Sequence, residues 1–231
     1  KKIEVYVPSI ANESNISPIT LAQQSKIIET VSGNVALANN PILALLEFNS
    51  IMFSILKANI VDYQPVYNTV DRVNFIIALK QHIDPVVTDD GVSFDLSKML
   101  ERNKSIEYKV APAEVASGEV TFNLVTPSLE VDDRINKLLL RRHTNSSQIK
   151  SLLSDVYIYE AVKFIDSIAV GDSTATITKD KAGVDALRGI DMSLLKPVFE
   201  YIGNVRQTEE AYTKSVLGDD TLDLTPDLFI S

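Results

Sequence analysis

The chain has 231 residues, of which 45% are hydrophobic and 23% are charged. These values are typical of a globular protein that can bury a sizeable core in one large domain or two small ones, and they argue against a disordered chain. A net charge of −9 disfavours nucleic acid and anionic membranes as partners, and the absence of cysteine excludes disulfides, thiolate nucleophiles and zinc–cysteine sites.

The first fifth of the chain predicts a strand followed by a helix. Residues Lys2 to Val7 alternate between polar and apolar side chains, which favours a half-buried strand. Ser17 and Pro18 suit the N-cap and the first position of a helix. We expect this helix to run to Ser32 and to stop at Gly33.

The segment from Pro41 to Ala58 is the most apolar part of the chain. Its apolar residues surround the predicted helix instead of forming one stripe, which indicates a helix that is central in its domain or buried between subunits. Both alternatives stay open at this point. The segment has only 18 residues and contains Glu47 and Lys57, whereas a membrane-spanning helix needs about 20 predominantly apolar residues. We therefore expect no membrane span.

The middle of the chain predicts one further helix and a small sheet. The helix begins near Asn68 or Thr69, and the sequence Asp89-Asp90-Gly91 is a turn signal. Alternating polar side chains suggest a sheet with one face in water. The predicted strands are Val92 to Asp95, Ser105 to Val110 and Glu119 to Val125.

The second half of the chain reads as mostly helical. A helix opens at Pro127 and ends with Arg141, Arg142 and His143, an order of charges that complements the helix dipole. After a polar break at Thr144 to Ser147, a second helix is expected to reach about Ile168.

A loop from Gly171 to Lys181, with one short strand at Ala175 to Thr178, leads to a last long helix. This helix begins near Lys196 and reaches Val216. The predicted fold class is α+β, with helices packed on a small, mainly antiparallel sheet and a helical C-terminal part. We expect an α+β core over 1–143 and a helical part with an acidic tail over 144–231, or alternatively a single domain.

The sequence predicts no catalytic, cofactor-binding or metal-binding residues. Ser173 follows Gly171-Asp172, but no histidine follows it, and a serine nucleophile needs a base within reach. The only histidines, His82 and His143, do not have the spacing of a metal-ligand pair. None of the 8 glycines lies in a phosphate-binding pattern.

Two charged segments are candidates for protein contacts. The densest basic group serves either as a dipole-complementing helix end or as a docking site for an acidic neighbour; its members are Lys137, Arg141, Arg142, His143 and Lys150. The acidic tail from Asp219 to Asp227 ends in apolar residues that include Leu228 and Phe229. This tip either enters a groove on a partner or folds back on its own domain.

Short motifs occur in a fixed order over nearly the whole chain. They are Val5-Tyr6-Val7-Pro8-Ser9, Ser17-Pro18-Ile19-Thr20, Thr69-Val70-Asp71-Arg72, Asn123-Leu124-Val125-Thr126-Pro127-Ser128, Tyr201-Ile202-Gly203-Asn204-Val205-Arg206, and the tail from Leu222 to Ile230. Their order, together with the length and the acidic tail, resembles a family of baseplate hub and tail-assembly proteins of T-even-like contractile-tailed bacteriophages.

The resemblance implies a non-enzymatic structural or assembly subunit in the virion tail baseplate, assembled in the host cytoplasm. Its expected partners are other baseplate or tail proteins and further copies of itself, without nucleic acid, membrane or cofactor. An assembly chaperone that is absent from the mature particle and a cytosolic enzyme with an unrecognised site are the alternatives.

The resemblance also assigns roles to matching positions. Pro8 and Ser9 would shape the N-terminal turn, Asp71 and Arg72 would start a helix, and Arg206 would lie on the exposed side of the last helix. Phe229 would dock at the tip, although Leu228 stands where a second aromatic residue is expected. The full set of interface candidates is Pro8, Ser9, Asp71, Arg72, Arg141, Arg142, Arg206, Leu228 and Phe229.

Overall fold

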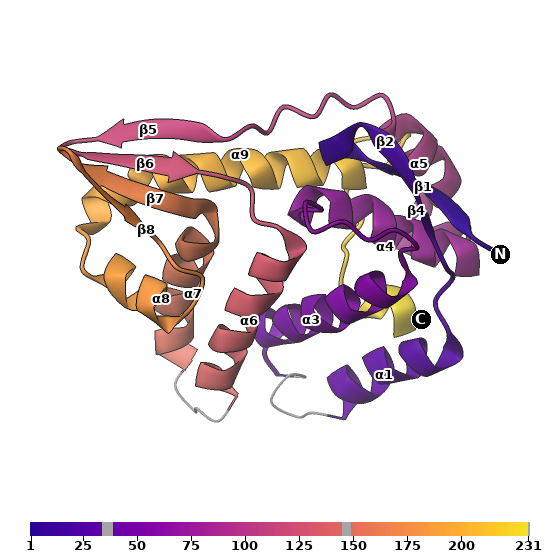
Figure 1. The fold of residues 1–231 in the computed structure, drawn as a ribbon. Coiled ribbons are helices and arrows are strands. Elements are labelled where there is room, and N and C mark those ends of the chain that lie inside the picture. Colours follow the sequence, from indigo (N-terminus) through magenta and orange to yellow (C-terminus); the bar gives the residue numbers. More distant parts are fainter. Residues whose placement is uncertain (34–38, 145–148, 231) are drawn as a thin grey trace. The chain divides into compact units, whose positions relative to one another are not determined.

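A computed structural model describes residues 1–33, 39–144 and 149–230 (Figure 1). It confirms the α+β class, with small antiparallel sheets and a helical C-terminal part. The chain divides into two compact units. Unit 1 consists of Lys1–Tyr108 and Thr208–Ser231, and unit 2 consists of Lys109–Gln207.

Unit 1 begins with an antiparallel hairpin. Strand β1 (Ile3–Val7) pairs with β2 (Asn12–Ile16) around the 3-10 turn η1 (Pro8–Ile10). The predicted strand at Lys2 to Val7 is therefore confirmed, whereas β2 was not predicted. Ala11 closes the turn with a φ of 48°, a conformation that lets its backbone N–H bond to the carbonyl of Pro8.

Helix α1 (Leu21–Ser32) begins later than the predicted start at Ser17-Pro18. The hydroxyl of Thr20 accepts a hydrogen bond from the backbone of Gln23, whose side chain bonds back to the Thr20 backbone. This reciprocal capping box fixes the helix start at Thr20. Gly33 caps the other end, as predicted.

Helix α3 (Pro41–Asn59) confirms the predicted apolar helix. Phe48, Met52 and Leu56 are completely buried and belong to the core of unit 1. By length and composition alone α3 could cross a membrane, with 33% of the apolar window buried. A core helix of a soluble protein meets the same criteria, so this finding does not assign α3 to a membrane.

The predicted turn at Asp89-Asp90-Gly91 is also confirmed. It joins β3 (Val86–Asp89) to β4 (Val92–Asp95), with positive φ angles of 47° at Asp90 and 77° at Gly91. Two consecutive residues with positive φ are the mark of a tight hairpin turn that matches the twist of the strands.

The strand predicted at Ser105 to Val110 is wrong. Helix α5 (Leu96–Asn103) precedes it, and the backbone N–H groups of Ser105 and Ile106 donate to carbonyls of its last residues, Arg102 and Asn103. These hydrogen bonds form a turn at the helix end instead of a strand ladder. The prediction rests on the alternating polar residues Glu107 and Lys109, and this alternation does not produce a strand here.

Unit 2 contains a four-stranded antiparallel sheet in the order β5-β6-β7-β8. Its strands are β5 (Ala113–Ser117), β6 (Val120–Leu124), β7 (Ile165–Val170) and β8 (Ser173–Thr176). The strand expected at Glu119 to Val125 corresponds to β6. The strand expected at Ala175 to Thr178 overlaps β8, which begins and ends two residues earlier. The inner face of the sheet buries Phe122 and Leu124.

Helices α6 (Leu129–His143) and α7 (Ile149–Phe164) follow β6 and precede β7 in the sequence. The two helices pack against each other. The helix predicted to reach Ile168 ends at Phe164, and β7 follows at once. The ammonium group of Lys179 donates to the carbonyls of Val162 and Ile165, which satisfies acceptors at the end of α7. Burial lowers the pKa of Lys179 to about 8.

The predicted boundary between 143 and 144 differs from the division that the structure shows. It falls between α6 and α7, which belong to the same unit, and the predicted break at 145–147 lies outside the described residues. The other elements of the described residues are α4 (Thr69–Ile83), α8 (Lys181–Arg188), η2 (Met192–Leu195), α9 (Lys196–Thr213) and α10 (Asp227–Ile230).

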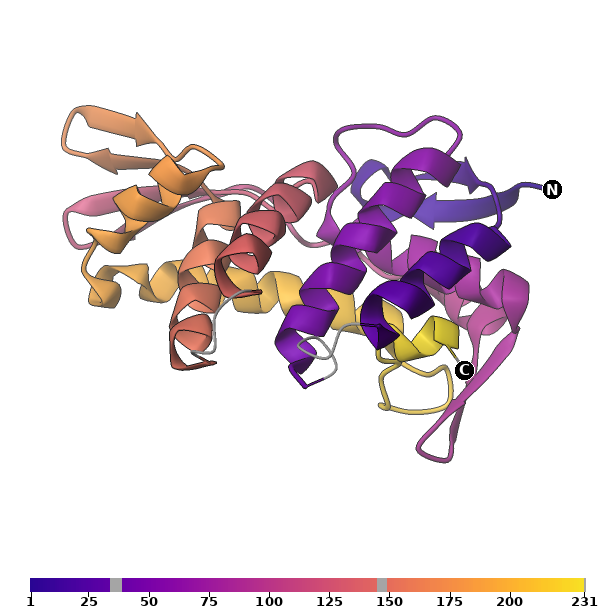
Figure 2. The same cartoon turned by 90° about the horizontal axis from the view of Figure 1, so that it is seen from below.

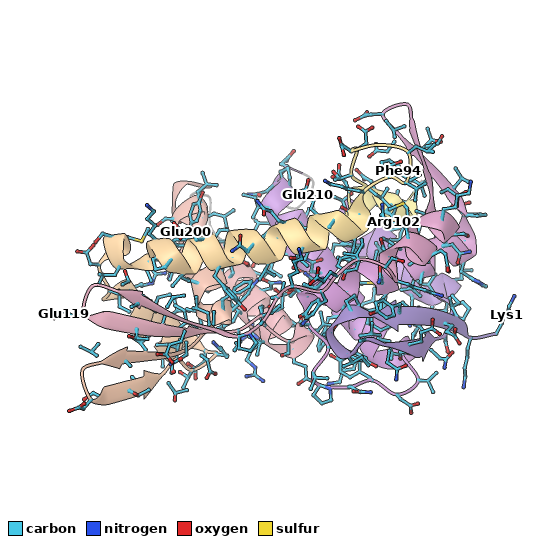
Figure 3. All side chains as sticks on the ribbon, turned by 90° about the horizontal axis from the view of Figure 1, so that it is seen from above. Lys1, Phe94, Arg102, Glu119, Glu200 and Glu210 are labelled. Atoms are coloured by element: carbon cyan, nitrogen blue, oxygen red, sulfur yellow. The ribbon has the colours of Figure 1, made fainter. Side chains whose placement is uncertain are left out.

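The C-terminal segment completes unit 1. The last helix α9 ends at Thr213, three residues before the predicted end, because Lys214 leaves the helix to bridge to Thr221. Arg102 lies beside this end of α9 in Figure 3 and donates to the carbonyl oxygen of Lys214 at 2.6 Å. Leu222 is 3% exposed, so the segment after the helix contributes to the core.

Truncation of Phe229 tests whether the C-terminal helix is part of that core. Phe229 is fully buried with its ring centroid 6.1 Å from that of Phe48, so Phe229→Ala should lower the free energy of unfolding of unit 1 by about 3–5 kcal/mol. Chemical denaturation measures this loss. The neighbouring Ile230, which is 38% exposed, provides the control, and Ile230→Ala should cost clearly less. Equal effects of the two substitutions would contradict the packing.

Candidate functional site

The first candidate site is a buried carboxylate in unit 1. Asp71 is completely buried near the start of α4 (Thr69–Ile83). Its Oδ1 accepts from the backbone N–H of Ser9 at 2.9 Å, and its Oδ2 accepts from the Ser9 hydroxyl at 2.5 Å and from the Asn68 N–H at 2.9 Å. Asn68 in turn caps the helix through the backbone of Val70 and Asp71.

This arrangement brings together three of the predicted interface candidates, Pro8, Ser9 and Asp71. The expected roles in the N-terminal turn and at the helix start agree with the positions observed. Pro8 and Asp71 are both buried, however, so they hold the hairpin to α4 and present no surface to a partner. Arg72 lies next on the helix, is half-buried, and stays a predicted contact residue.

The environment of Asp71 shifts its acidity. Burial raises the pKa of this carboxyl above its usual range, while the hydrogen bonds from Ser9 and Asn68 act in the opposite direction. Asn68 also donates to the phenol oxygen of Tyr108 at 2.8 Å. Each carboxylate oxygen of Asp71 therefore has hydrogen-bond donors of its own. This arrangement supports a structural role as a helix cap.

A second buried network in unit 1 was not predicted from the sequence. The Asn103 amide donates to Asn74 Oδ1 at 2.8 Å and to the carbonyl of Tyr212 at 2.9 Å. Asn74 donates to the carbonyl of Tyr6 at 3.0 Å. Two amide side chains thereby join β1, α4, α5 and the end of α9.

Unit 2 has a cationic clamp around Asp155, whose side chain is 3% exposed. The carboxylate accepts from Arg142 Nε at 2.7 Å and from an Arg188 guanidinium nitrogen at 2.8 Å, and His143 Nε2 lies 2.7 Å away. Burial opposes ionisation, but the bonds from His143 and Arg188 and the charges of both arginines outweigh it and lower the pKa of Asp155.

The clamp changes the interpretation of the predicted basic group. His143 is buried and is therefore not part of a surface patch, and Lys137 pairs with Asp133 at 2.9 Å. Arg142 keeps about half of its side chain exposed while binding Asp155, and Arg141 is exposed. Arg141 and Arg142 stay predicted contact residues, whereas the side chain of Lys150 lies outside the described residues.

The third network surrounds Lys163, whose side chain is 2% exposed. Its ammonium donates to Asp132 at 2.9 Å, to Asn136 at 2.6 Å and to Glu160. Glu160 also accepts from Arg206 on α9. Burial opposes ionisation of Glu160, but the charges of Lys163 and Arg206 prevail and lower its pKa.

Arg206 therefore has an internal role that the resemblance did not imply. Besides Glu160, its guanidinium lies over the ring of Phe164 with 5.8 Å to the centroid. The side chain is 39% exposed, so the expectation of an exposed position holds only in part. A partner could contact only the outer part of this arginine.

The tail resolves the alternative that the sequence left open. Leu228 and Phe229 are buried, and the backbone carbonyl of Phe229 accepts from the Gln24 amide at 3.0 Å. The tip folds back on its own unit, and the expected docking of Phe229 into a partner is corrected accordingly. The apolar character of these side chains is satisfied by the core around Phe48.

Within 1–33, 39–144 and 149–230, no group of three or more histidine and acidic side chains could hold a metal ion. The buried acids Asp71, Asp132 and Asp155 and the half-buried Glu160 bind donors of their own unit. No family model, curated protein or solved structure matches this chain.

Replacing Asp155 with asparagine tests the cationic clamp. The substitution removes the negative charge of a buried carboxylate that binds His143 and two arginines, which are 52% and 34% exposed, so the free energy of unfolding of unit 2 should fall by about 1–3 kcal/mol at neutral pH. Because the folded pKa lies below the ordinary value of 3.8, the carboxylate contributes stability above that value and loses it as pH falls through the folded pKa.

Denaturation of wild type and Asp155→Asn should therefore show a difference in stability that shrinks as the pH falls from 5 to below 3.8. The control is Asp185→Asn, because Asp185 forms an exposed ion pair with Lys181 in the same unit. It should change stability by no more than about 0.5 kcal/mol. A pH-independent difference for Asp155→Asn would refute the role of the charge.

Removal of the Tyr212 hydroxyl should have the opposite effect and raise the stability of its unit. It is buried and has no hydrogen-bond partner in the described part of the chain, and burial raises the pKa of Tyr212. Tyr212→Phe should raise the free energy of unfolding of unit 1 by about 1 kcal/mol, because an unsatisfied donor is removed. Tyr201→Phe should instead destabilise unit 2, since the Tyr201 hydroxyl donates to the Ala111 carbonyl at 2.8 Å. Destabilisation by Tyr212→Phe would show that its hydroxyl is bonded.

Proposed function

We propose that this chain is a non-enzymatic structural or assembly subunit of the baseplate hub of a contractile phage tail, and that it acts through protein–protein contacts. The ordered motifs between Val5 and Ile230 support this proposal through their resemblance to that family. A protein of this kind needs rigid units that present contact surfaces, and the buried networks around Asp71, Asp155 and Lys163 provide rigidity.

The observation that carries the proposal is the incomplete burial of α3. Its side chains Phe48, Met52 and Leu56 are in the core, but a second apolar row lies along the same helix. This row, which we call the α3 row, consists of Ile42, Leu45, Leu46 and Phe53.

The members of the α3 row recur at spacings of three, four and seven residues, which place them along one side of the helix. Leu45 is 40% exposed, and the other three are half-buried. Partly exposed apolar side chains along one side of a helix are typical of surfaces that bind other proteins, although Phe53 also packs edge-to-face against Tyr63 of its own unit. The row therefore fits a contact with an apolar surface of another baseplate or tail protein.

The enzyme alternative receives less support. An active site needs titratable groups that converge on a cavity and are free to react. The most strongly engaged acids, Asp155 and Glu160, are neutralised by arginine or lysine side chains of their own unit. This pattern supports a stabilising role for these charges.

Mass spectrometry of purified particles from the phage that encodes this chain tests the proposal. A fixed copy number per tail would identify a resident subunit. Detection in infected cells together with hub proteins, but not in particles, would identify an assembly factor. Absence from particles combined with no association with any tail protein would refute both forms of the proposal.

A charge in the α3 row tests the contact surface itself. Leu45→Glu should leave the fold intact, because the side chain is already 40% exposed, and should abolish co-purification with tail proteins from infected cells. Ser54→Glu is the matched control, because Ser54 is exposed on the same helix outside the α3 row. Circular dichroism verifies both folds. Unchanged co-purification of a folded Leu45→Glu protein would remove the α3 row as the contact.

A further inference from the structure

Three buried side chains of unit 2 bring an amine, an amide and a carboxyl group together. Lys163 lies near the end of α7, and Asp132 and Asn136 lie one turn apart on α6. Figure 2 shows α6 and α7, in shades of red, lying side by side, and the two helices are in contact. All three side chains are buried, so water has almost no access to them.

The amide of Asn136 is held between the other two groups. Its Oδ1 accepts from Lys163 Nζ at 2.6 Å, and its Nδ2 donates to Asp132 Oδ2 at 3.2 Å. The other oxygen of Asp132 lies 2.9 Å from Lys163 Nζ. Because a C=O bond is about 1.23 Å long, Nζ lies within about 3.8 Å of the amide carbon of Asn136. A small movement therefore brings this nitrogen to about 3–3.5 Å, the distance at which reacting atoms are poised for attack.

The charges around these groups permit Lys163 to give a proton to Asp132. Lys163 and Arg206 carry positive charges here, and Asp132 and Glu160 carry negative charges. Glu160 has Arg206 as a counter-charge of its own, so it does not require the charge of Lys163. Transfer of one proton within the ion pair leaves the sum of charges unchanged. Burial penalises both charges of the ion pair but neither member of the neutral pair, which favours the neutral amine.

We propose that Lys163 and Asn136 form an intramolecular isopeptide bond, with Asp132 as the group that transfers the protons. The new bond joins Lys163 Nζ to the side-chain amide carbon of Asn136. The bond between that carbon and Nδ2 breaks, and the Asn136 nitrogen leaves as ammonia. The product links α6 covalently to α7 within unit 2.

The three protons of the Lys163 ammonium group balance the reaction. The first passes to Asp132 and frees the lone pair of Nζ, which attacks the amide carbon. The second leaves Nζ in the tetrahedral intermediate and reaches the departing nitrogen through the Asp132 carboxyl group, which completes the ammonia. The third remains on the new amide, and Asp132 ends as a neutral acid. The step consumes no oxidant and no further reactant, and a positioned proton-transfer group of this kind accelerates such reactions.

Asn136 is a better acceptor for the amine than the acids beside it. An ionised carboxylate repels a nucleophile, whereas the amide carbon of Asn136 is uncharged and its oxygen already accepts from Nζ. Burial also distinguishes this lysine from one at the surface. Lys181 and Asp185 form an ion pair with side chains that are 84% and 53% exposed, where water stabilises both charges.

The cross-link acts on unit 2 as a disulfide acts on a secreted protein. It joins two residues that lie 27 positions apart, and such a closure restricts the unfolded chain. The chain has no cysteine and therefore forms no disulfide. An isopeptide bond has the further property that thiol reductants do not break it, so it persists in a reducing compartment.

Mass spectrometry of the purified, folded chain tests the proposal. The intact protein should weigh about 17 Da less than its sequence, because one ammonia is lost. Trypsin cleaves after lysine and arginine but should no longer cleave after Lys163, whose amine is part of the new bond. The digest should therefore contain the peptide 135–137 attached to the peptide 151–179.

Three variants separate the roles of the groups. Lys163→Arg keeps the positive charge but has no amine that can form the bond, so it should retain the full mass of its sequence. Lys181→Arg is the matched control, because Lys181 is exposed, and it should lose ammonia as the wild type does. Asp132→Asn keeps both reacting groups but lacks the carboxyl group that transfers the protons, and it should also retain its full mass.

A folded wild type with the full mass of its sequence would overturn the proposal. The same holds for a loss of ammonia without joined peptides, which is the mark of a cyclic imide at an asparagine, and for a loss of water, which would make a carboxyl group the acceptor. The wild-type measurement decides the matter even where Lys163→Arg or Asp132→Asn fails to fold. The inference is independent of the proposed function, because it is measured on purified protein without phage components.

Discussion

Both units depend on one constraint, which is that an ionised side chain removed from water must have a partner of its own. Asp155 meets this requirement with side chains from α6 and α8, and Lys163 meets it with side chains from α6 and α7. Glu160 extends the second network to Arg206 on α9. The helices of unit 2 are thereby fixed to one another by directional bonds, in addition to apolar packing. Asp71 has the same function in unit 1, where it joins the N-terminal hairpin to α4.

Local signals made several elements predictable. Asn68 starts α4 through hydrogen bonds to residues two and three positions later, and the turn at Asp90-Gly91 depends on the backbone angles of these two residues alone. Both features are local, so the sequence predicts them. Strand β7 is different, because its partner β6 is more than 40 residues earlier, with Phe122 opposite Ile168. The apolar residues before Val170 continued the period of α7, so only the distant pairing explains why the helix ends at Phe164.

The same distinction applies to the candidate site. The sequence placed Asp71 at a helix start, but its partner Ser9 lies 62 residues away, and no local pattern joins the two. The sequence does not single out Asp155, because a lone acid in the middle of a helix has no distinguishing spacing. The sequence permits two alternatives for the tail tip, since an apolar end is equally suited to a partner or to its own core. In each case the missing information was a contact between distant segments.

The division of the chain has a consequence for the order of folding during synthesis. Unit 2 is continuous, whereas unit 1 is made of the first 108 residues and of the segment from Thr208 onward, which begins inside α9. Tyr212 and Phe229 are fully buried in unit 1 and leave the ribosome after the whole of unit 2. Unit 2 can therefore reach its native state while unit 1 still lacks part of its core. The N-terminal segment must remain soluble with an incomplete interior until the segment from Thr208 onward has been synthesised, so it needs chaperone protection for longer than unit 2 does.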